Sequence, residues 1–247
     1  MTQVDVLAFA AHPDDAELGC GATLALAAES GLRVAVADLT AGEMATNGTT
    51  SERLRERDEA SSALGLCDRV CLGLPDGRLG EAAQDRMIVL DAIRRFRPQV
   101  VIAPQTLADR HPDHSAAGRL VQEACFLSGV AKMGTPAPPH RPRAVHHYSV
   151  HSPFTPTFVV DVTSTWQRKM RAVRAYQSQF GPTAPAGSTA LADPRFLEVV
   201  EAKGSYFGAM IGAERGEPFS SMGPLATTSV PGLRDEGDLP AGLPYVM

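Results

Sequence analysis

The chain of 247 residues is 44% hydrophobic and 21% charged, which is typical of a globular protein with an ample hydrophobic core. Its formal net charge of −5 argues against a nucleic-acid-binding protein, because such a protein needs a basic face. No apolar run reaches the length of a membrane span, and no leader segment precedes the first apolar run. The four cysteines form no CxxC pair, as is usual in a reducing compartment. We therefore expect a cytoplasmic protein that has neither a membrane nor a nucleic acid as partner.

The first hundred residues alternate between apolar, strand-like runs and helical patterns. Strands are predicted at 4–10, 33–39, 69–72 and 100–103, and helices at 16–30, 52–64 and 82–96. Ser51 is the expected cap of the second helix, and Gly65 is its expected end. This βαβαβαβ order predicts a single α/β domain of the Rossmann-like, doubly wound type. Its sheet would be mostly parallel, with helices on both faces.

The second half of the chain is less regular. Helices are predicted at 116–127, 166–179 and from 193 or 194 to 210, and strands at 144–150 and 157–162. The Pro-rich segment 135–142 and the Gly/Pro/Ala-rich segment 181–190 are expected to be loops, and turns are expected from Gly212 onward. We expect one domain over residues 1–228 and an irregular tail over 229–247.

Two turns rich in His and Asp follow two of the predicted strands. The first turn carries His12, Asp14 and Asp15, directly after the strand at 4–10. The second turn is the segment 109–114, Asp-Arg-His-Pro-Asp-His, after the strand at 100–103. Ligands of open α/β sheets bind at the carboxyl ends of the strands, so the two turns can face each other across one crevice. The pattern predicts a metal ion held between them.

The residue types at these turns suit a catalytic zinc ion. His12, Asp15 and His114 offer two neutral nitrogens and one carboxylate, which leaves a coordination position open for water. Water bound to such a metal reaches a pKa of about 7, so hydroxide becomes available at neutral pH. A structural zinc site would prefer four ligands that include thiolates, and the cysteines are not placed for that.

The remaining polar groups of the turns are candidates for acid–base chemistry. Asp14 is the candidate general base, and His111 is the candidate general acid, with Asp113 expected to orient His111 and keep it protonated. For either turn alone, an Asp that stabilises the start of a helix explains the pattern about equally well. Two such turns, each behind a buried strand, favour the functional interpretation.

Several segments of the chain resemble those of one known family. They are AHPDDAELGCG (11–21), DLTAGEMATNGT (38–49), LGLPDGRL (72–79), RHPDH (110–114), PHRP (139–142) and YQSQF (176–180). With these segments the chain resembles the PIG-L or LmbE-like family of zinc-dependent N-acetylglucosaminyl deacetylases. The less specific segments, those other than the two His–Asp motifs, look like the bacillithiol-biosynthesis branch of this family, whose substrate is N-acetylglucosaminyl malate. Another thiol-sugar or antibiotic-sugar substrate in the same family is the alternative.

The resemblance implies roles for individual residues. It implies that His12, Asp15 and His114 bind one zinc ion per subunit, that Asp14 is the base, and that His111 is the acid or oxyanion partner. It also implies trimers or hexamers. Five substrate-binding residues are expected: Arg53, Arg110, Glu43, Asn47 and His140.

Each of these five has a simpler explanation. Arg53 can be a solvated helix charge, Arg110 can form an ordinary salt bridge, and Glu43 and Asn47 suit turns. His140 can be a surface or packing residue. The branch also carries a Tyr that helps to hold the oxyanion, and Phe196 takes that place here. Tyr206 is the residue that could substitute for it.

Two functions of other classes compete with a hydrolase. A nucleotide-binding protein would fit the strand order, but the first turn lacks a GxGxxG fingerprint and puts acids where phosphate would lie. A metal-binding protein without catalysis is the second competitor. Release of acetate from an acetylated glucosaminide distinguishes it from an enzyme.

Overall fold

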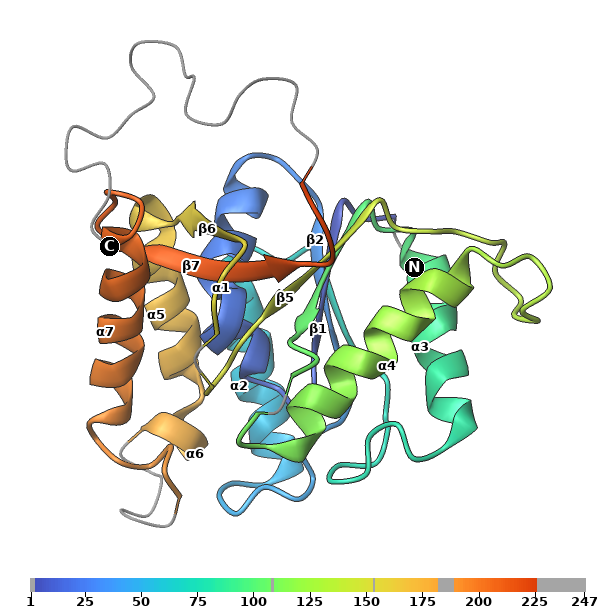
Figure 1. The fold of residues 1–247 in the computed structure, drawn as a ribbon. Coiled ribbons are helices and arrows are strands. Elements are labelled where there is room, and N and C mark those ends of the chain that lie inside the picture. Colours follow the sequence, from blue (N-terminus) through green and yellow to red (C-terminus); the bar gives the residue numbers. More distant parts are fainter. Residues whose placement is uncertain (1–2, 108, 153, 182–188, 226–247) are drawn as a thin grey trace, which may run out of the picture.

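The computed structural model describes residues 3–107, 109–152, 154–181 and 189–225, which build one seven-stranded sheet in the order β3-β2-β1-β4-β5-β7-β6 (Figure 1). The strands are β1 (Val6–Ala10), β2 (Val34–Asp38), β3 (Asp68–Cys71), β4 (Val100–Pro104), β5 (Ala144–Tyr148), β6 (Phe158–Asp161) and β7 (Gly216–Ser221). Strands β1 to β5 run parallel, and β7 pairs antiparallel with both β5 and β6. The predicted single α/β domain with a mostly parallel sheet is confirmed.

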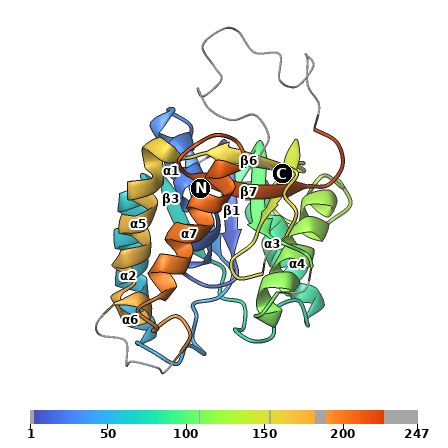
Figure 2. The same ribbon diagram turned by 60° about the vertical axis from the view of Figure 1, so that its left-hand side comes forward.

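Helices cover both faces of the sheet. They are α1 (Asp15–Glu29), α2 (Thr50–Leu64), α3 (Ala83–Phe96), α4 (Pro112–Ser128), α5 (Trp166–Ala175), α6 (Gln177–Phe180) and α7 (Phe196–Ala209), with a short 3-10 turn, η1 (Thr163–Thr165), before α5. In both views α3 and α4 lie together on one side, while α2 and α5 lie on the other (Figures 1 and 2). No helix of the described ranges is long and apolar enough to cross a membrane.

Strand β1 shows why the sheet must be covered on both faces. All five of its residues are buried, and alternate side chains point to opposite faces of a strand. Leu7 and Phe9 belong to the core that α3 and α4 cover. Val6, Ala8 and Ala10 belong to the core under α1, α2 and α5. Neither face of β1 therefore needs polar residues, which explains its continuous apolar run.

The order of the strands creates a crevice at the carboxyl ends of β1 and β4. The chain runs outward from β1 through β2 to β3 and then returns to the other side of β1 as β4. Such a reversal is the point at which ligands bind in open α/β sheets. Both His–Asp turns follow these two strands, so the topology brings them together.

Three elements differ from the sequence-based prediction. Helix α4 begins at Pro112 rather than at 116, because proline suits the first helical position and His111 is the N-cap. Its first turn therefore contains Asp113 and His114. The predicted helix over 166–179 is divided at Tyr176 into α5 and α6. The cap of α2 is Thr49, which forms a capping box with Glu52, and not Ser51.

Strand β7 was not predicted, because the composition from Gly212 onward is rich in turn residues; Pro218 within the segment is also unusual for a strand. Pro218 is opposite Val159 of β6 but lies beyond the short pairing with β5, which involves only Ser220 and Ser221 of β7. On the side of β5, Pro218 therefore has no neighbouring strand whose backbone hydrogen bonds its missing N–H would interrupt. The predicted tail at 229–247 lies outside the described residues, so the domain boundary at 228 stays a prediction.

Helix α4 lies very close to the end of β4. A Cβ atom added to Gly118 would lie 2.5 Å from the carbonyl oxygens of both Pro104 and Gln105. These are backbone atoms, so they cannot rotate away as a flexible side chain could. The missing side chain of Gly118 thus lets α4 approach β4, which places His114, one turn earlier, at the sheet edge.

We expect Gly118→Ala to destabilise the protein by about 1–3 kcal/mol, because the helix must move away from β4. Alanine is the better helix former by about 1 kcal/mol, so a helix with room for the methyl group would instead gain stability. Urea unfolding of the metal-free protein measures the difference. Gly134→Ala is the matched control, since no atom lies within 4 Å of its added Cβ. A Gly118→Ala protein as stable as the wild type would contradict the close approach.

Candidate metal centre and active site

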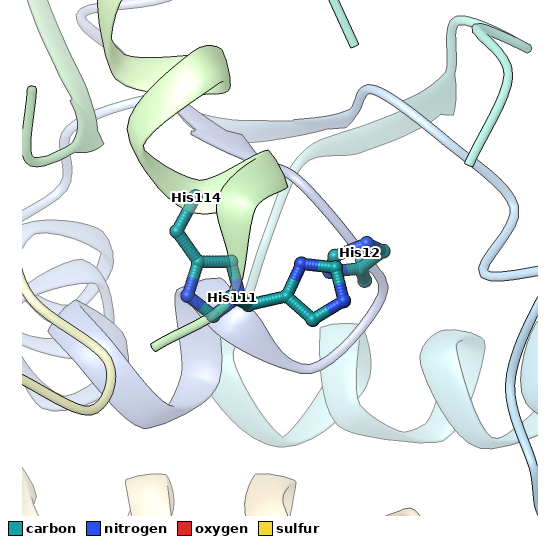
Figure 3. A group of neighbouring side chains, drawn as sticks. All are labelled: His12, His111 and His114. Carbon is teal, nitrogen blue, oxygen red and sulfur yellow. The ribbon is translucent and has the colours of Figure 1, made fainter. Parts of the chain in front are cut away.

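The two predicted turns meet in one cluster of three histidines. The ring centroids of His12 and His111 are 4.7 Å apart, those of His12 and His114 are 5.6 Å apart, and those of His111 and His114 are 5.2 Å apart. Each ring offers a nitrogen within 4.8 Å of the other two. In Figure 3 the rings lie side by side, with His111 and His114 coming from the start of α4. The three rings could therefore share a metal ion.

Asp15 joins two of the predicted ligands. Its Oδ2 lies 3.3 Å from Nδ1 of His12, and its Oδ1 lies 3.1 Å from Nε2 of His114. Oδ2 also accepts the backbone N–H of His12 at 2.8 Å, which fixes the carboxylate at the start of α1. The structure thus brings together His12, Asp15 and His114, the set expected to bind metal.

Two further carboxylates face the opposite edge of the His12 ring. Oδ1 of Asp76 lies 3.1 Å from Nε2 of His12, and Oδ2 of Asp113 lies 3.4 Å from the same nitrogen. A metal-binding histidine usually donates its other ring N–H to a carboxylate, which fixes the tautomer. With Nε2 engaged in this way, Nδ1 of His12, on the side of Asp15, is the nitrogen available to a metal.

The charges around the cluster favour a cation. Burial alone would lower the pKa of His12 and of His114. The carboxylates of Asp113, Asp15 and Asp76 instead raise the pKa of His12 well above its usual value. Asp15 and Asp109 likewise raise the pKa of His114 to about 9. A place that stabilises buried imidazolium ions this strongly also fits a divalent metal ion with these residues as its ligands.

Asp14 lies beside this cluster in a strained conformation. Its backbone φ of 124° is unusual for a residue with a side chain. Its Oδ2 accepts a hydrogen bond from the Arg53 guanidinium at 2.9 Å, and the same nitrogen donates to the Pro13 carbonyl at 2.7 Å. Burial raises the pKa of Asp14 to about 7, with Arg53 opposing and Asp15 adding to the shift. A carboxylate with this pKa can both accept and return a proton near neutrality.

His111 is held in one tautomer. As the N-cap of α4 it accepts the backbone N–H of Asp113 through Nδ1 at 3.3 Å, so the neutral ring carries its proton on Nε2. Burial, together with the charges of His12 and His114, lowers the pKa of His111. The lowered pKa favours the neutral ring, which would donate a hydrogen bond from Nε2.

The role expected for Asp113 is corrected. Its carboxylate accepts the Gly77 backbone N–H at 2.7 Å and faces His12, rather than orienting His111. Its backbone N–H donates to His111, and the charge of its carboxylate acts to raise the pKa of that histidine without a hydrogen bond to the ring. The reason is the helix start at Pro112, which puts Asp113 in the first turn with its side chain toward the β3–α3 loop.

The cluster lines a cavity of about 200 Å³, and of the five expected substrate-binding residues only Arg53 lines it. Arg53 and His151 line this cavity together with Gln179. Glu43 is exposed and accepts the backbone N–H of Asp76 at 2.9 Å, so it supports the loop that carries Asp76. Asn47 is buried, and its carbonyl accepts a hydrogen bond from Gln179.

The other expected residues lie farther from the cluster. Arg110 is exposed beside His111 and lines a neighbouring cavity. His140 is not part of the site: its Nε2 lies 2.7 Å from the carbonyl oxygen of Pro98, before the amino end of β4 and thus at the opposite end of the sheet. The Pro-rich loop that carries it follows the far end of α4.

The two aromatic residues weighed for the oxyanion lie elsewhere. The ring of Phe196 stacks on that of Phe180, with 5.3 Å between centroids. Tyr206 is 64% exposed on α7, and its ring packs edge-on against Phe207. Neither ring lines the 200 Å³ cavity, so Tyr206 does not take the place of the missing tyrosine.

Sequence reasoning missed two residues of the site. The Leu-Pro-Asp-Gly segment that contains Asp76 is typical of a turn, and a single histidine such as His151 is typical of a surface or packing residue. His151 stacks on His114 with 5.3 Å between ring centroids. Both residues follow the carboxyl end of a parallel strand, β3 for Asp76 and β5 for His151. That position was the available signal.

Comparisons with known proteins agree with this site. A family model described as PIG-L, GlcNAc-PI de-N-acetylase, matches residues 7–125, which include both His–Asp turns. Diacetylchitobiose deacetylase from Thermococcus kodakarensis is 32% identical over 189 residues, 71% of this chain and 70% of that protein. A probable N-acetyl-alpha-D-glucosaminyl L-malate deacetylase from Bacillus cereus is 27% identical over 193 residues, 70% of this chain and 83% of that protein.

A solved structure extends the likeness to the whole fold. The conserved protein TT1542 from Thermus thermophilus is 41% identical, with a TM-score of 0.84 over 94% of this chain and 100% of that one. The residues that the family model matches include His12, Asp15 and His114. The chain therefore belongs to the PIG-L family and is an amide-hydrolysing N-deacetylase.

Proposed function

We propose that the protein is a zinc-dependent deacetylase that removes the acetyl group from an N-acetylglucosaminide, and that its substrate is N-acetylglucosaminyl malate in bacillithiol biosynthesis. One observation carries the reaction: His12, Asp15 and His114 converge with Asp14 and His111 at one cavity. The Bacillus cereus relative supports the malate conjugate. The Thermococcus kodakarensis relative supports a second candidate, a neutral disaccharide. The predicted trimeric or hexameric assembly and cytoplasmic location stay predictions.

His12, Asp15 and His114 are the proposed metal ligands. Two imidazoles and one carboxylate are the ligand types of catalytic zinc sites, and three protein ligands leave room for substrate. When bound, such an ion polarises a carbonyl group and lowers the pKa of a water molecule to about 7. Asp76 and Asp113 would orient His12 for this role.

Asp14 would carry the proton through the reaction. Arg53 holds its carboxylate next to Asp15, where it can take a proton from the attacking water. The water oxygen then joins the acetyl carbon, and the C–N bond breaks. We assign the return of the proton to the departing nitrogen to Asp14 and not to His111, the general acid expected from the sequence, because burial and the charges of His12 and His114 lower the pKa of His111. His111, protonated on Nε2, would donate a hydrogen bond to the acetyl oxygen as it becomes negative. The products are acetate and a free amine.

The first test is acetate release from N-acetylglucosaminyl malate and, in parallel, from N,N′-diacetylchitobiose. We expect the zinc-loaded protein to release acetate, a chelator to abolish the release, and added Zn²⁺ to restore it. His114→Ala should neither retain zinc nor release acetate, because it lacks one of three ligands. Acetate release that persists undiminished after complete removal of the metal would contradict the proposed metal dependence. Faster turnover of diacetylchitobiose than of the malate conjugate would show that the neutral disaccharide, and not the malate conjugate, is the preferred substrate.

Asp14→Asn tests the proton carrier. The amide keeps the shape of the carboxylate but cannot accept the proton, so kcat should fall by on the order of 10²–10⁴. Zinc content should remain that of the wild type, because Asp14 is not a proposed ligand. Asp58→Asn, at an exposed position on α2, is the control and should leave both quantities unchanged. Wild-type turnover by a zinc-loaded Asp14→Asn protein would exclude this role.

Asp76→Asn tests the carboxylate behind His12. Loss of such a partner typically weakens metal binding by about 10–100-fold, because the ligand is no longer held in one tautomer and orientation. Competition with a chelating dye measures the zinc affinity directly, without reference to turnover. Asp58→Asn again serves as the control. Unchanged zinc affinity in Asp76→Asn would show that Asp76 does not orient the ligand.

A further inference from the structure

A second cavity, of about 550 Å³, adjoins the cavity of the His–Asp cluster. The two cavities share Leu18 and His151 as lining residues. The second lies where α7 packs against β7, and its lining includes Lys203 of α7 and Arg110, next to His111. A molecule at the cluster can therefore extend past His151 into this space.

The sizes of the two cavities indicate that the substrate extends in this way. Small-molecule sites usually occupy about 300–1,000 Å³. The cavity at the cluster, at about 200 Å³, lies below that range, while its neighbour lies within it. An acetylated sugar with a second group attached thus needs both spaces. The acetamide must lie at the cluster, so the second group lies beyond His151.

Two of the four cations that line the second cavity are already neutralised. Nζ of Lys169 lies 2.6 Å from Oε1 of Glu217, and both side chains are buried. The Arg195 guanidinium lies 2.7 Å from Oδ2 of Asp193. These pairs leave little charge on Lys169 and Arg195 for a ligand.

Lys203 and Arg110 have no such carboxylate. Lys203 donates hydrogen bonds to the carbonyls of Ser149 at 2.6 Å and Val150 at 3.3 Å, which uses two of its three N–H groups. Among the described residues, no Asp or Glu forms an ion pair with Lys203 or Arg110. Burial, aided by the charge of Lys169, lowers the pKa of Lys203 to about 8. The ammonium is still mostly protonated at neutral pH and would be stabilised by an anion.

We propose that this cavity binds the group attached to the acetylated sugar, that this group carries a carboxylate, and that Lys203 and Arg110 select it. The inference rests on the proposed function, because it assumes that the acetamide lies at the His–Asp cluster. The guanidinium of Arg110 suits a two-pronged contact with a carboxylate, and the third N–H of Lys203 supplies a second charged donor in the same cavity. A neutral sugar in the same place gains neither contact.

The test compares Lys203→Met and Arg110→Ala with the wild type on the malate conjugate and on neutral N,N′-diacetylchitobiose. Removal of either cation should raise KM for the malate conjugate by on the order of tenfold or more, because a charge-assisted hydrogen bond to the carboxylate disappears. The kcat for the malate conjugate, and both constants for diacetylchitobiose, should stay within about twofold. Lys132→Met, at an exposed position after α4, is the matched control and should change nothing.

A third variant keeps the test valid if Lys203→Met folds poorly. Val199 is 62% exposed and lines the same cavity, so Val199→Glu adds a negative charge without disturbing the core. This substitution should weaken binding of the malate conjugate but not of diacetylchitobiose, as removal of either cation does. Equal effects on both substrates, or none on the malate conjugate, would overturn the proposal.

Calorimetric binding of the product, glucosaminyl malate, separates this inference from the proposed function. Product binding that depends on Lys203 and Arg110 supports the anion site even if no acetate is released. Acetate release from both substrates without discrimination by these variants supports the deacetylase and overturns the anion site.

Discussion

The site depends on the bridge that Asp15 makes between His12 and His114, because this carboxylate ties the loop after β1 to the start of α4. The same few residues concentrate negative charge in a buried place: Asp14 lies next to Asp15, and Asp76 faces His12. Buried carboxylates are costly unless cations or hydrogen bonds compensate them. The two imidazoles and Arg53 supply part of that compensation, and a divalent ion held by the ligand set would supply the rest.

A second layer of buried charges fixes the helix that carries Asp15. Arg69 donates to both carboxylate oxygens of Asp38, at 2.9 and 2.8 Å, and also contacts Glu17. The Tyr176 hydroxyl lies 3.2 Å from the same Glu17 carboxylate. These contacts join the first turn of α1 to β2, to β3 and to the segment after α5. Glu17 of the acidic motif is thus a structural residue, while its neighbours two and three positions earlier line the cavity.

The fold and the heart of the site could be predicted because their signals are local. Each His–Asp turn directly follows a continuous apolar strand, and a parallel sheet puts all such turns at one edge. Asp76 and His151 also follow parallel strands, but the residues around them are not distinctive: Leu-Pro-Asp-Gly has the composition of any turn, and His151 follows a strand of mixed polarity. Strand β7 was missed because its segment is rich in turn residues and contains Pro218, and only the one-sided pairing of β7 makes that proline acceptable. Pairing between strands that are far apart in the chain cannot be recognised from the residue pattern of one short segment.

The charge balance at the cluster also bears on how the enzyme can select its substrate. Among the described residues, Arg53 is the sole Lys or Arg that lines the cluster's own cavity, and its guanidinium is engaged by Asp14. In the absence of a metal ion, an anionic group placed there would lie near the carboxylates of Asp76 and Asp15. The proposed carboxylate-bearing substrate would instead lie with its acetamide toward the cluster and its charge toward the side of His151. Lys203 and Arg110 lie on that side. The carboxylates that favour a metal ion at the cluster would therefore also determine which end of the substrate enters first.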